Sequence, residues 1–174
     1  MKSISLLAVI LFAPLVLAHG PTPQKVVEAV EIAAPVERVW NAVKDFAAIA
    51  RWHPGLAASE GNDGNAPGAR RTLRLRNGEE VVEELDAYDE ANREYAYRLR
   101  RENVKAIPAS SYSAVFKVTA AGDGARVEWK SRLYRGDTGN MPPEELNDEA
   151  AVRAMQSFFR SGLDHLKTML ESSG

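Results

Sequence analysis

The sequence of 174 residues contains no cysteine. This absence excludes disulfide bonds, thiolate catalysis, redox pairs and cysteine-ligated zinc sites. Internal repeats, linkers and low-complexity tracts are also missing. Packing of apolar side chains must therefore stabilise the fold, and a chain of this length buries enough surface to do so as one domain.

Several catalytic motifs are absent as well. The sequence has no serine nucleophile elbow, phosphate loop, zinc-protease helix or dinucleotide fingerprint. Its formal charge of −2 provides no excess of basic residues for a dedicated nucleic-acid binder. We therefore expect a protein that is not an enzyme, that carries no cofactor and that does not bind nucleic acid.

One long hydrophobic run is present, at the N-terminus. It covers residues 4–17, two positions after Lys2, and is too short to span a bilayer permanently. We interpret residues 1–18 as a signal peptide, whose cleavage leaves His19 as the first residue of a domain over residues 19–174. Loss of Lys2 moves the formal charge from −2 to −3. The mature protein is expected to be exported without a membrane span and, in a bacterium with an outer membrane, to be periplasmic.

Apolar periodicity predicts an α+β domain. A first strand over residues 25–33 precedes a helix that begins at Pro35 and continues through Ile49. A long helix with an acidic N-terminus follows Pro143. Further strands are predicted within residues 56–68 and around residues 73–75, 81–85, 95–99, 112–118 and 127–133. This order favours a sheet with one apolar face that the last helix covers.

Segments spread over nearly the whole domain resemble a known superfamily. They are "APVERVWNAVKDFAAIARWHPG", "GARRTLRLRNGEEVVEEL", "YAYRL", "IPASSY", "VEWKSRLY" and the closing "NDEAAVRAM…GLDHLK". Together they resemble the SRPBCC superfamily of START, Bet v 1 and polyketide-cyclase-like proteins. The resemblance implies a helix-grip fold, in which a curved antiparallel sheet of about six to seven strands grips a long C-terminal helix around a hydrophobic cavity.

Three shorter segments narrow the resemblance. The mature start "HGPTPQKV", the tripeptide "WHP" and "PPEELNDEAAV" look like the MxaD type, periplasmic accessory proteins of bacterial methanol oxidation. This implies a helper of methanol dehydrogenase or of its cytochrome c partner. Two alternatives stay open because one fold serves many functions. They are a cavity enzyme resembling polyketide cyclases and dehydratases, and a carrier of a small apolar ligand or of a metal such as calcium or a lanthanide.

The turn at Asn77-Gly78 predicts a buried ion pair. If the hairpin loop has three residues and ends in Gly78, Arg71 faces Glu83 on the apolar side of the sheet. A loop of two residues would instead place Arg71 opposite Glu84. The first register is preferred because it keeps the apolar residues of both strands inward, and it agrees with the superfamily, in which an arginine and a glutamate point into the cavity. The pair could orient a ligand, supply a general acid, or be purely structural.

Eight residues are candidates for lining the cavity and binding a small ligand. Trp52 and His53 follow the first helix, where the superfamily places the cavity mouth. His53 could act as a general base or metal ligand, or it could be an ordinary capping or packing residue. The aromatic candidates share an inward phase, which suits either a pocket or a plain core. The full set is Trp52, His53, Arg71, Glu83, Tyr95, Tyr97, Tyr112 and Trp129.

Two weaker metal hypotheses concern the ends of the domain. His19 would offer an amine and an imidazole to copper but needs a second histidine, for which His53 and His165 are available. The acidic helix start at residues 144–149 could bind a hard cation, although it lacks the spacing of a calcium loop. A loosely held terminus and an ordinary acidic helix start are the simpler interpretations, and no metal is predicted.

Charged residues also alternate on the outward side of the predicted strands. The arginines are Arg70, Arg74, Arg76, Arg98 and Arg100, and the acidic residues are Glu80, Glu84 and Asp86. Cross-strand ion pairs on a solvated face explain this checkerboard. A docking face for an acidic partner is the alternative.

Overall fold

The computed structural model describes residues 20–62 and 64–172. The predicted signal peptide, residues 1–18, and the copper candidate His19 lie outside the described residues. No helix within the described part is long and apolar enough to cross a bilayer.

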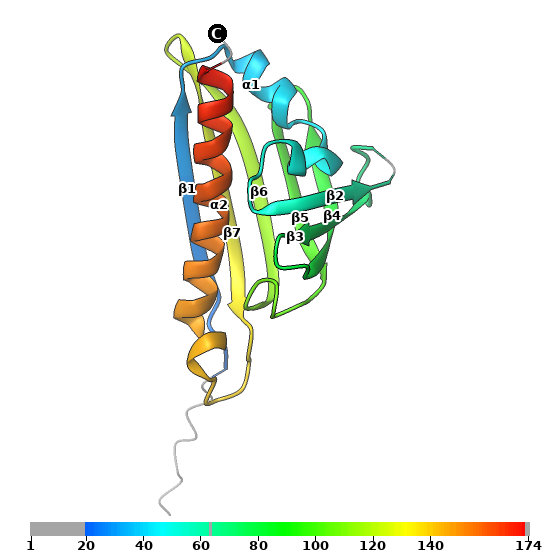
Figure 1. Cartoon of the computed structure of the whole chain (residues 1–174), viewed down its shortest axis with the longest axis vertical. Coiled ribbons are helices and arrows are strands. Elements are labelled where there is room, and N and C mark those ends of the chain that lie inside the picture. The colour runs from blue at the N-terminus through cyan, green and yellow to red at the C-terminus, as the bar shows by residue number, and fades with distance from the viewer. Residues whose placement is uncertain (1–19, 63, 173–174) are drawn as a thin grey trace, which may run out of the picture.

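A seven-stranded antiparallel sheet forms the framework of the domain, as predicted. Its strand order is β1-β7-β6-β5-β4-β3-β2, so the first strand of the chain pairs with the last. The sheet curves around one side of the molecule (Figure 1). Its strands are β1 (Gln24–Ile32), β2 (Leu56–Gly61), β3 (Arg70–Leu75), β4 (Glu80–Asp89), β5 (Glu94–Arg101), β6 (Ala109–Ala121) and β7 (Gly124–Arg135).

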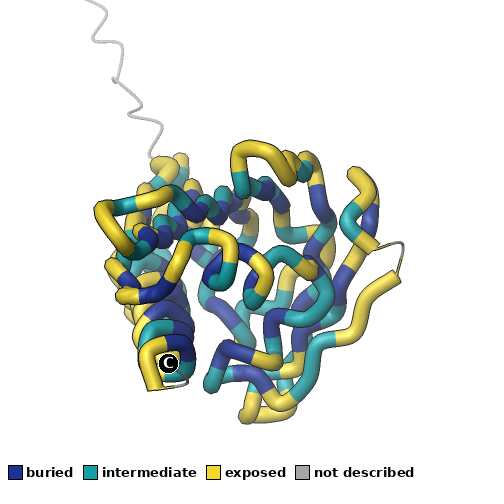
Figure 2. The backbone as a smooth tube through the Cα atoms, turned by 90° about the horizontal axis from the view of Figure 1, so that it is seen from above, coloured by how far each residue is buried: buried dark blue, intermediate teal, exposed yellow. Residues whose placement is uncertain are grey.

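The long helix α2 (Asp148–Glu171) covers the concave face of the sheet. In Figure 1 it lies over β1 and β7, and viewed from above the buried segments face the space between helix and sheet (Figure 2). The Asn147 side chain caps the helix by accepting a hydrogen bond from the Ala150 N–H at 2.8 Å. The predicted C-terminal helix is confirmed, although the acidic residues just before Asn147 form a separate short 3₁₀ helix, η2 (Glu144–Leu146).

The segment after β1 forms two helices rather than one. The helix α1 (Val36–Val43) ends at Lys44, and a 3₁₀ helix, η1 (Phe46–Arg51), follows. Asp45 separates them because its backbone is extended (φ −78°, ψ 106°) and its side chain accepts a hydrogen bond from the Ala47 N–H. The prediction of one continuous helix through Ile49 was therefore wrong, because the apolar stripe passes over this polar break.

The hairpin between β3 and β4 has the predicted register. Arg71 pairs with Glu83 and Leu73 with Val81 across the two strands. Gly78 adopts a positive φ of 87°, as the last residue of a three-residue loop with a G1 bulge requires. The arrangement that would have placed Arg71 opposite Glu84 does not occur.

Candidate functional site

The predicted ion pair of Arg71 and Glu83 lies at the centre of the domain. The Arg71 Nε donates to Glu83 Oε2 at 2.6 Å, and the exposed fractions of the two side chains are 1% and 3%. The Tyr112 hydroxyl donates to Glu83 Oε1 at 2.7 Å. Arg71 Nη1 donates to the backbone carbonyl of Phe46 at 2.7 Å and so joins the sheet to η1. The prediction that these two charges pair is confirmed.

Aromatic rings surround the Arg71 guanidinium. Its central carbon lies 4.0 Å from the Phe46 ring centroid and 4.8 Å from that of Tyr97, within range of cation–π attraction. Burial acts to lower the pKa of Arg71, but the Glu83 charge and the nearby phenols outweigh it and raise the pKa. Burial, followed by the Glu83 charge, raises the pKa of the Tyr97 phenol well above its ordinary value. Arg71 is therefore charged and these phenols are neutral at physiological pH.

The other aromatic candidates pack against one another and against α2. Tyr95 stacks on Phe116 at 5.2 Å between ring centroids, and Trp129 stacks on Phe159 of α2 at 4.2 Å. The Trp129 Nε1–H donates to the Tyr97 hydroxyl at 2.8 Å. The stacking contacts bury the apolar surface of the rings, and the hydrogen bond gives the buried indole N–H of Trp129 an acceptor.

His53 joins the turn after η1 to the middle of α2. Its Nδ1 accepts a hydrogen bond from the Gly55 N–H at 3.1 Å, so the proton is on Nε2, which donates to the Phe158 carbonyl at 2.9 Å. Burial lowers the pKa of His53 to about 4, so the ring is neutral at physiological pH. The ring also stacks on Phe158 at 4.0 Å. Both ring nitrogens of His53 are therefore engaged in hydrogen bonds. The geometry is that of an ordinary capping and packing residue, one of the two roles considered for His53 above.

A glycine permits this close approach. A Cβ at Gly162 would lie 2.6 Å from the Cδ2 atom of His53, which is closer than two carbon atoms can pack. The helix α2 therefore packs directly against the His53 ring.

The internal space between sheet and helix is filled around the candidate residues. None of the eight exposes more than 3% of its surface, so other protein atoms enclose their side chains almost completely. The open cavity that the fold class predicts is therefore not found at these residues, because bulky aromatic side chains and Arg71 occupy the space. Two buried N–H donors among them lack a hydrogen-bond partner, the Trp52 Nε1 and the Arg71 Nη2. A ligand could reach these donors only if neighbouring side chains moved.

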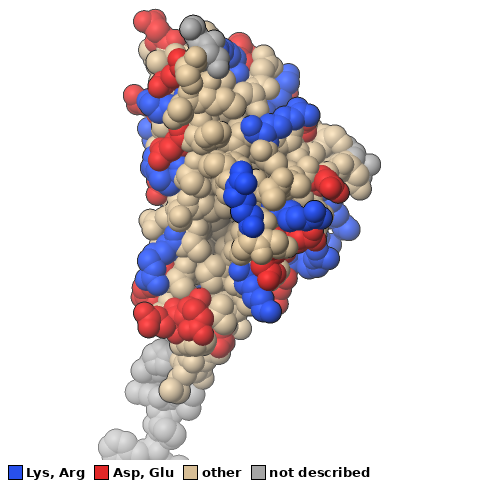
Figure 3. All heavy atoms as spheres, viewed as in Figure 1, with Lys and Arg blue, Asp and Glu red and all other residues tan. Residues whose placement is uncertain are grey.

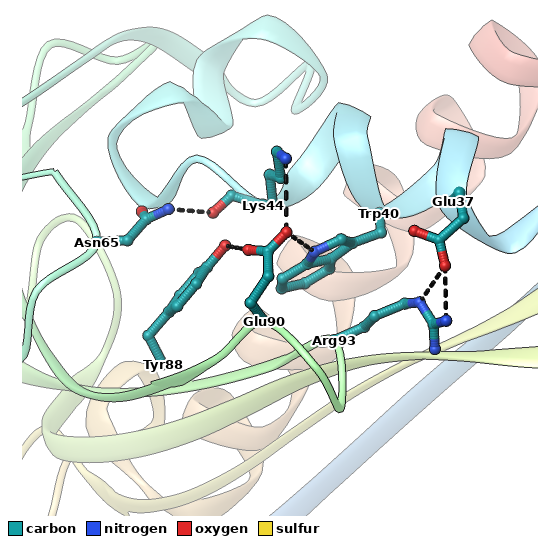
Figure 4. Close-up of polar contacts among 7 residues, drawn as sticks. All are labelled: Glu37, Trp40, Lys44, Asn65, Tyr88, Glu90 and Arg93. Carbon is teal, nitrogen blue, oxygen red and sulfur yellow. Dashed lines mark hydrogen bonds and ion pairs between the residues drawn. The ribbon is translucent and has the colours of Figure 1, made fainter.

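A second polar cluster, not predicted from the sequence, connects α1 to the turn between β4 and β5. Glu90 Oε1 accepts a hydrogen bond from the Trp40 Nε1–H at 3.0 Å and lies 3.5 Å from the Lys44 ammonium. Its other oxygen accepts a short hydrogen bond from Tyr88, which is the largest cause of a lowered Glu90 pKa (Figure 4). Arg93, in the same turn, pairs with Glu37 of α1 at 2.6 Å. In the sequence, residues 89–92 indicate only a turn between two strands.

The acidic start of the last helix shows no metal-binding arrangement. Asp148 pairs with Arg135 at 3.2 Å. Acidic side chains gather at the lower end of the molecule in Figure 3, where Figure 1 shows the start of α2. Within residues 20–62 and 64–172, no group of three or more histidine or acidic side chains is placed to hold a metal ion. Asp148 and Glu149 form the acidic first turn of α2, whereas Glu144 and Glu145 belong to η2.

The outward charges on β3, β4 and β5 form the expected cross-strand pairs. Glu84 lies 2.8 Å from Arg70, 3.2 Å from Arg100 and 3.9 Å from Arg98. Arg98 also pairs with Asp86 at 2.8 Å. The predicted checkerboard is thus confirmed for these residues, whereas Arg76 lies in the turn beyond β3 and donates to the Pro54 carbonyl.

Comparison with solved structures shows the same fold in other proteins. The protein XoxI from Bacillus cereus shares the fold at a TM-score of 0.71 and 21% identity, over 84% of this chain and 95% of that one. The protein Ara h 8.0201 matches at 0.64 and 19% identity, over 87% and 99%. A Thermobifida fusca protein matches at 0.67 and 29% identity, over 85% and 93%. The fold is the Bet v 1-like helix grip, as the sequence predicted.

The family follows from the sequence match. Residues 23–171 match the model of the family described as polyketide cyclase/dehydrase and lipid transport, and the chain belongs to this family. A search of curated proteins finds no match.

Proposed function

We propose that this chain is an exported, periplasmic accessory protein of methanol oxidation that assists methanol dehydrogenase or its cytochrome c partner without catalysing a reaction. The segments "HGPTPQKV", "WHP" and "PPEELNDEAAV" and the signal-like N-terminus support the pathway. The packed interior supports a role that does not depend on an internal cavity. Such a protein would act through its outer surface.

The observation that carries the non-catalytic role is the state of the internal polar groups. His53 is neutral with both nitrogens hydrogen-bonded, and Glu83 is held by Arg71 and Tyr112. A general acid or base must reach the proton that it transfers, and these groups are already occupied and shielded from solvent. This supports binding rather than catalysis.

The test is to immobilise the mature chain and to pass over it a periplasmic extract from methanol-grown cells of its source. The expected result is recovery of methanol dehydrogenase or of its cytochrome c, identified by mass spectrometry. Adding the free chain to the purified pair should then change the rate of cytochrome reduction. Recovery of neither protein, together with an unchanged rate, would refute the proposal.

A second candidate function is the carriage of a small apolar molecule with a carbonyl or carboxylate group. The two unpartnered donors, Trp52 Nε1 and Arg71 Nη2, favour it because a buried donor without a partner costs free energy that a ligand oxygen would recover. Native mass spectrometry of protein purified from its own periplasm should then show a bound small molecule. An unliganded mass throughout would exclude this candidate.

A further inference from the structure

The outer face of the sheet, on the side away from α2, contains an open trough along β6. Its volume is about 630 Å³, and a smaller hollow of about 280 Å³ shares Pro23, Ser113 and Arg132 with it. The cause is a difference in side-chain length between neighbouring strands. The outward residues of β6 in the trough and the smaller hollow are the small Ser111, Ser113 and Val115, whereas the facing residues of β7 are Tyr134, Arg132 and Lys130.

Unpaired positive charge borders the trough. Lys25 of β1 faces Arg132 directly across the strands, and both side chains are exposed. Like charges in facing positions destabilise a sheet. Neither residue has an ion pair within the described part of the chain, whereas Lys130 pairs with Glu128 at 3.7 Å. Asp86 also lines the trough, and its charge is paired with Arg98 at 2.8 Å. On β3 and β4 the facing charges are opposite in sign, as with Arg70 and Glu84. Folding alone gives no reason for the repulsive pair.

Two apolar side chains extend the same surface. Val27 and Tyr134 are 43% and 37% exposed, and they are two of the three large apolar side chains exposed in residues 20–62 and 64–172. Val27 faces Lys130 on β7, and Tyr134 lines the smaller hollow. A ligand that matches this surface needs carboxylates for the cations and apolar groups for the border.

We propose that this trough binds an extended acidic segment of a partner protein, with Lys25, Lys130 and Arg132 pairing its carboxylates. Such a segment can lie along β6 and fill a narrow hollow, which a flat membrane surface cannot. The inference rests on the proposed function in one respect, namely that the protein contacts its partner through the outer face of the sheet. It names neither methanol dehydrogenase nor the cytochrome, so a synthetic peptide can test it when the pull-down fails.

The first experiment reverses one charge. The probe is a fluorescein-labelled peptide of about ten residues in which glutamate alternates with alanine, long enough when extended to follow β6 through both hollows. Binding to the mature chain is followed by fluorescence anisotropy. Arg132→Glu should weaken binding about tenfold, as loss of a close charge pair does. Arg153→Glu is the matched control, because it makes the same change at an exposed position of α2 and should alter binding less than about twofold, as a distant screened charge does.

The same variant separates binding from folding. Arg132→Glu places a carboxylate opposite Lys25, so its thermal midpoint should stay unchanged or rise while peptide binding falls. Raising the salt concentration from about 50 to 300 mM should weaken binding to the wild type and remove the difference between the two variants. Equal losses in both variants, or no binding of the peptide at low salt, would overturn the proposal.

The second experiment fills the trough without changing charge. Ser113→Tyr places a ring on the floor, and Thr119→Tyr is the control farther along the same face of β6. The first should abolish peptide binding and the second should preserve it.

Sedimentation of the wild type should give a monomer. A salt-sensitive dimer that Arg132→Glu dissociates would show instead that a second copy occupies the trough, and tighter binding to anionic phospholipid vesicles than to the peptide would also refute the proposal.

Discussion

Two ion pairs lie next to each other on β3 and β4 and face opposite sides of the sheet. Arg71 and Glu83 point inward, with side chains 1% and 3% exposed, whereas the Arg70 side chain is 55% exposed and that of Glu84 is 13% exposed. The distances are similar, 2.6 Å and 2.8 Å. The comparison shows that burial, rather than distance, decides what each pair does, since both inner charges have lost their water whereas Arg70 in the outer pair has kept much of its own.

The inner pair should be the most sensitive point of the molecule. Glu83→Gln leaves Arg71 charged and unpaired in the core, which should lower the free energy of unfolding by about 3–5 kcal/mol. Urea unfolding followed by tryptophan fluorescence measures this loss. The double variant Arg71→Met/Glu83→Leu should recover most of it, because no buried charge remains. A fully stable Glu83→Gln variant would show that water reaches the pair.

The contact between α2 and the His53 ring should come next. Gly162→Ala places a methyl group 2.6 Å from the His53 Cδ2 atom, and overpacking of this kind should cost about 3 kcal/mol. Ser161→Ala, at the exposed neighbouring position, is the control and should leave the thermal midpoint nearly unchanged. If Gly162→Ala were as stable as the control, the helix would have to stand farther from the ring than described.

A pH effect of intermediate size follows from the same ring. The pKa of His53 is lowered from 6.5 to about 4 on folding, so between these values the unfolded chain binds more protons than the folded one. Stability is therefore complete above pH 6.5 and falls as the pH drops towards 4, with a loss of about 2 kcal/mol between pH 7 and pH 5. His53→Asn should lack this part of the slope in urea unfolding at the two pH values. Parallel slopes would assign the dependence to other groups.

The smallest effect is expected on the outer face. Three arginines cover Glu84, but each is about half exposed, so water still solvates the network. Glu84→Gln should therefore leave the thermal midpoint nearly unchanged, in contrast with Glu83→Gln one residue earlier. Differential scanning calorimetry at low salt is the most sensitive measurement. A loss comparable to that of Glu83→Gln would remove the distinction between the two faces.

The parts of this site that were predictable are those that local chemistry determines. The Asn77-Gly78 turn sets the register of its hairpin, and the register sets the pairing of Arg71 with Glu83. The contacts that completed the site span long stretches of chain. Tyr112 reaches Glu83 across 29 residues and His53 reaches Phe158 across 105. The apolar periodicity indicates which residues point inward. It does not give the summed volume of their side chains relative to the space between sheet and helix, so the filled interior could not be predicted.

The position of β1 has a consequence for how the chain folds. β1 pairs with β7 in the sheet, and the C-terminal helix covers both strands. Glu171 at the end of α2 accepts a hydrogen bond from the Ala33 N–H just after β1. The core therefore closes only when the last residues are available, and pairings between distant segments form slowly. A polypeptide with this order of assembly stays open while its C-terminal helix is missing, which would suit the export that we propose for this chain.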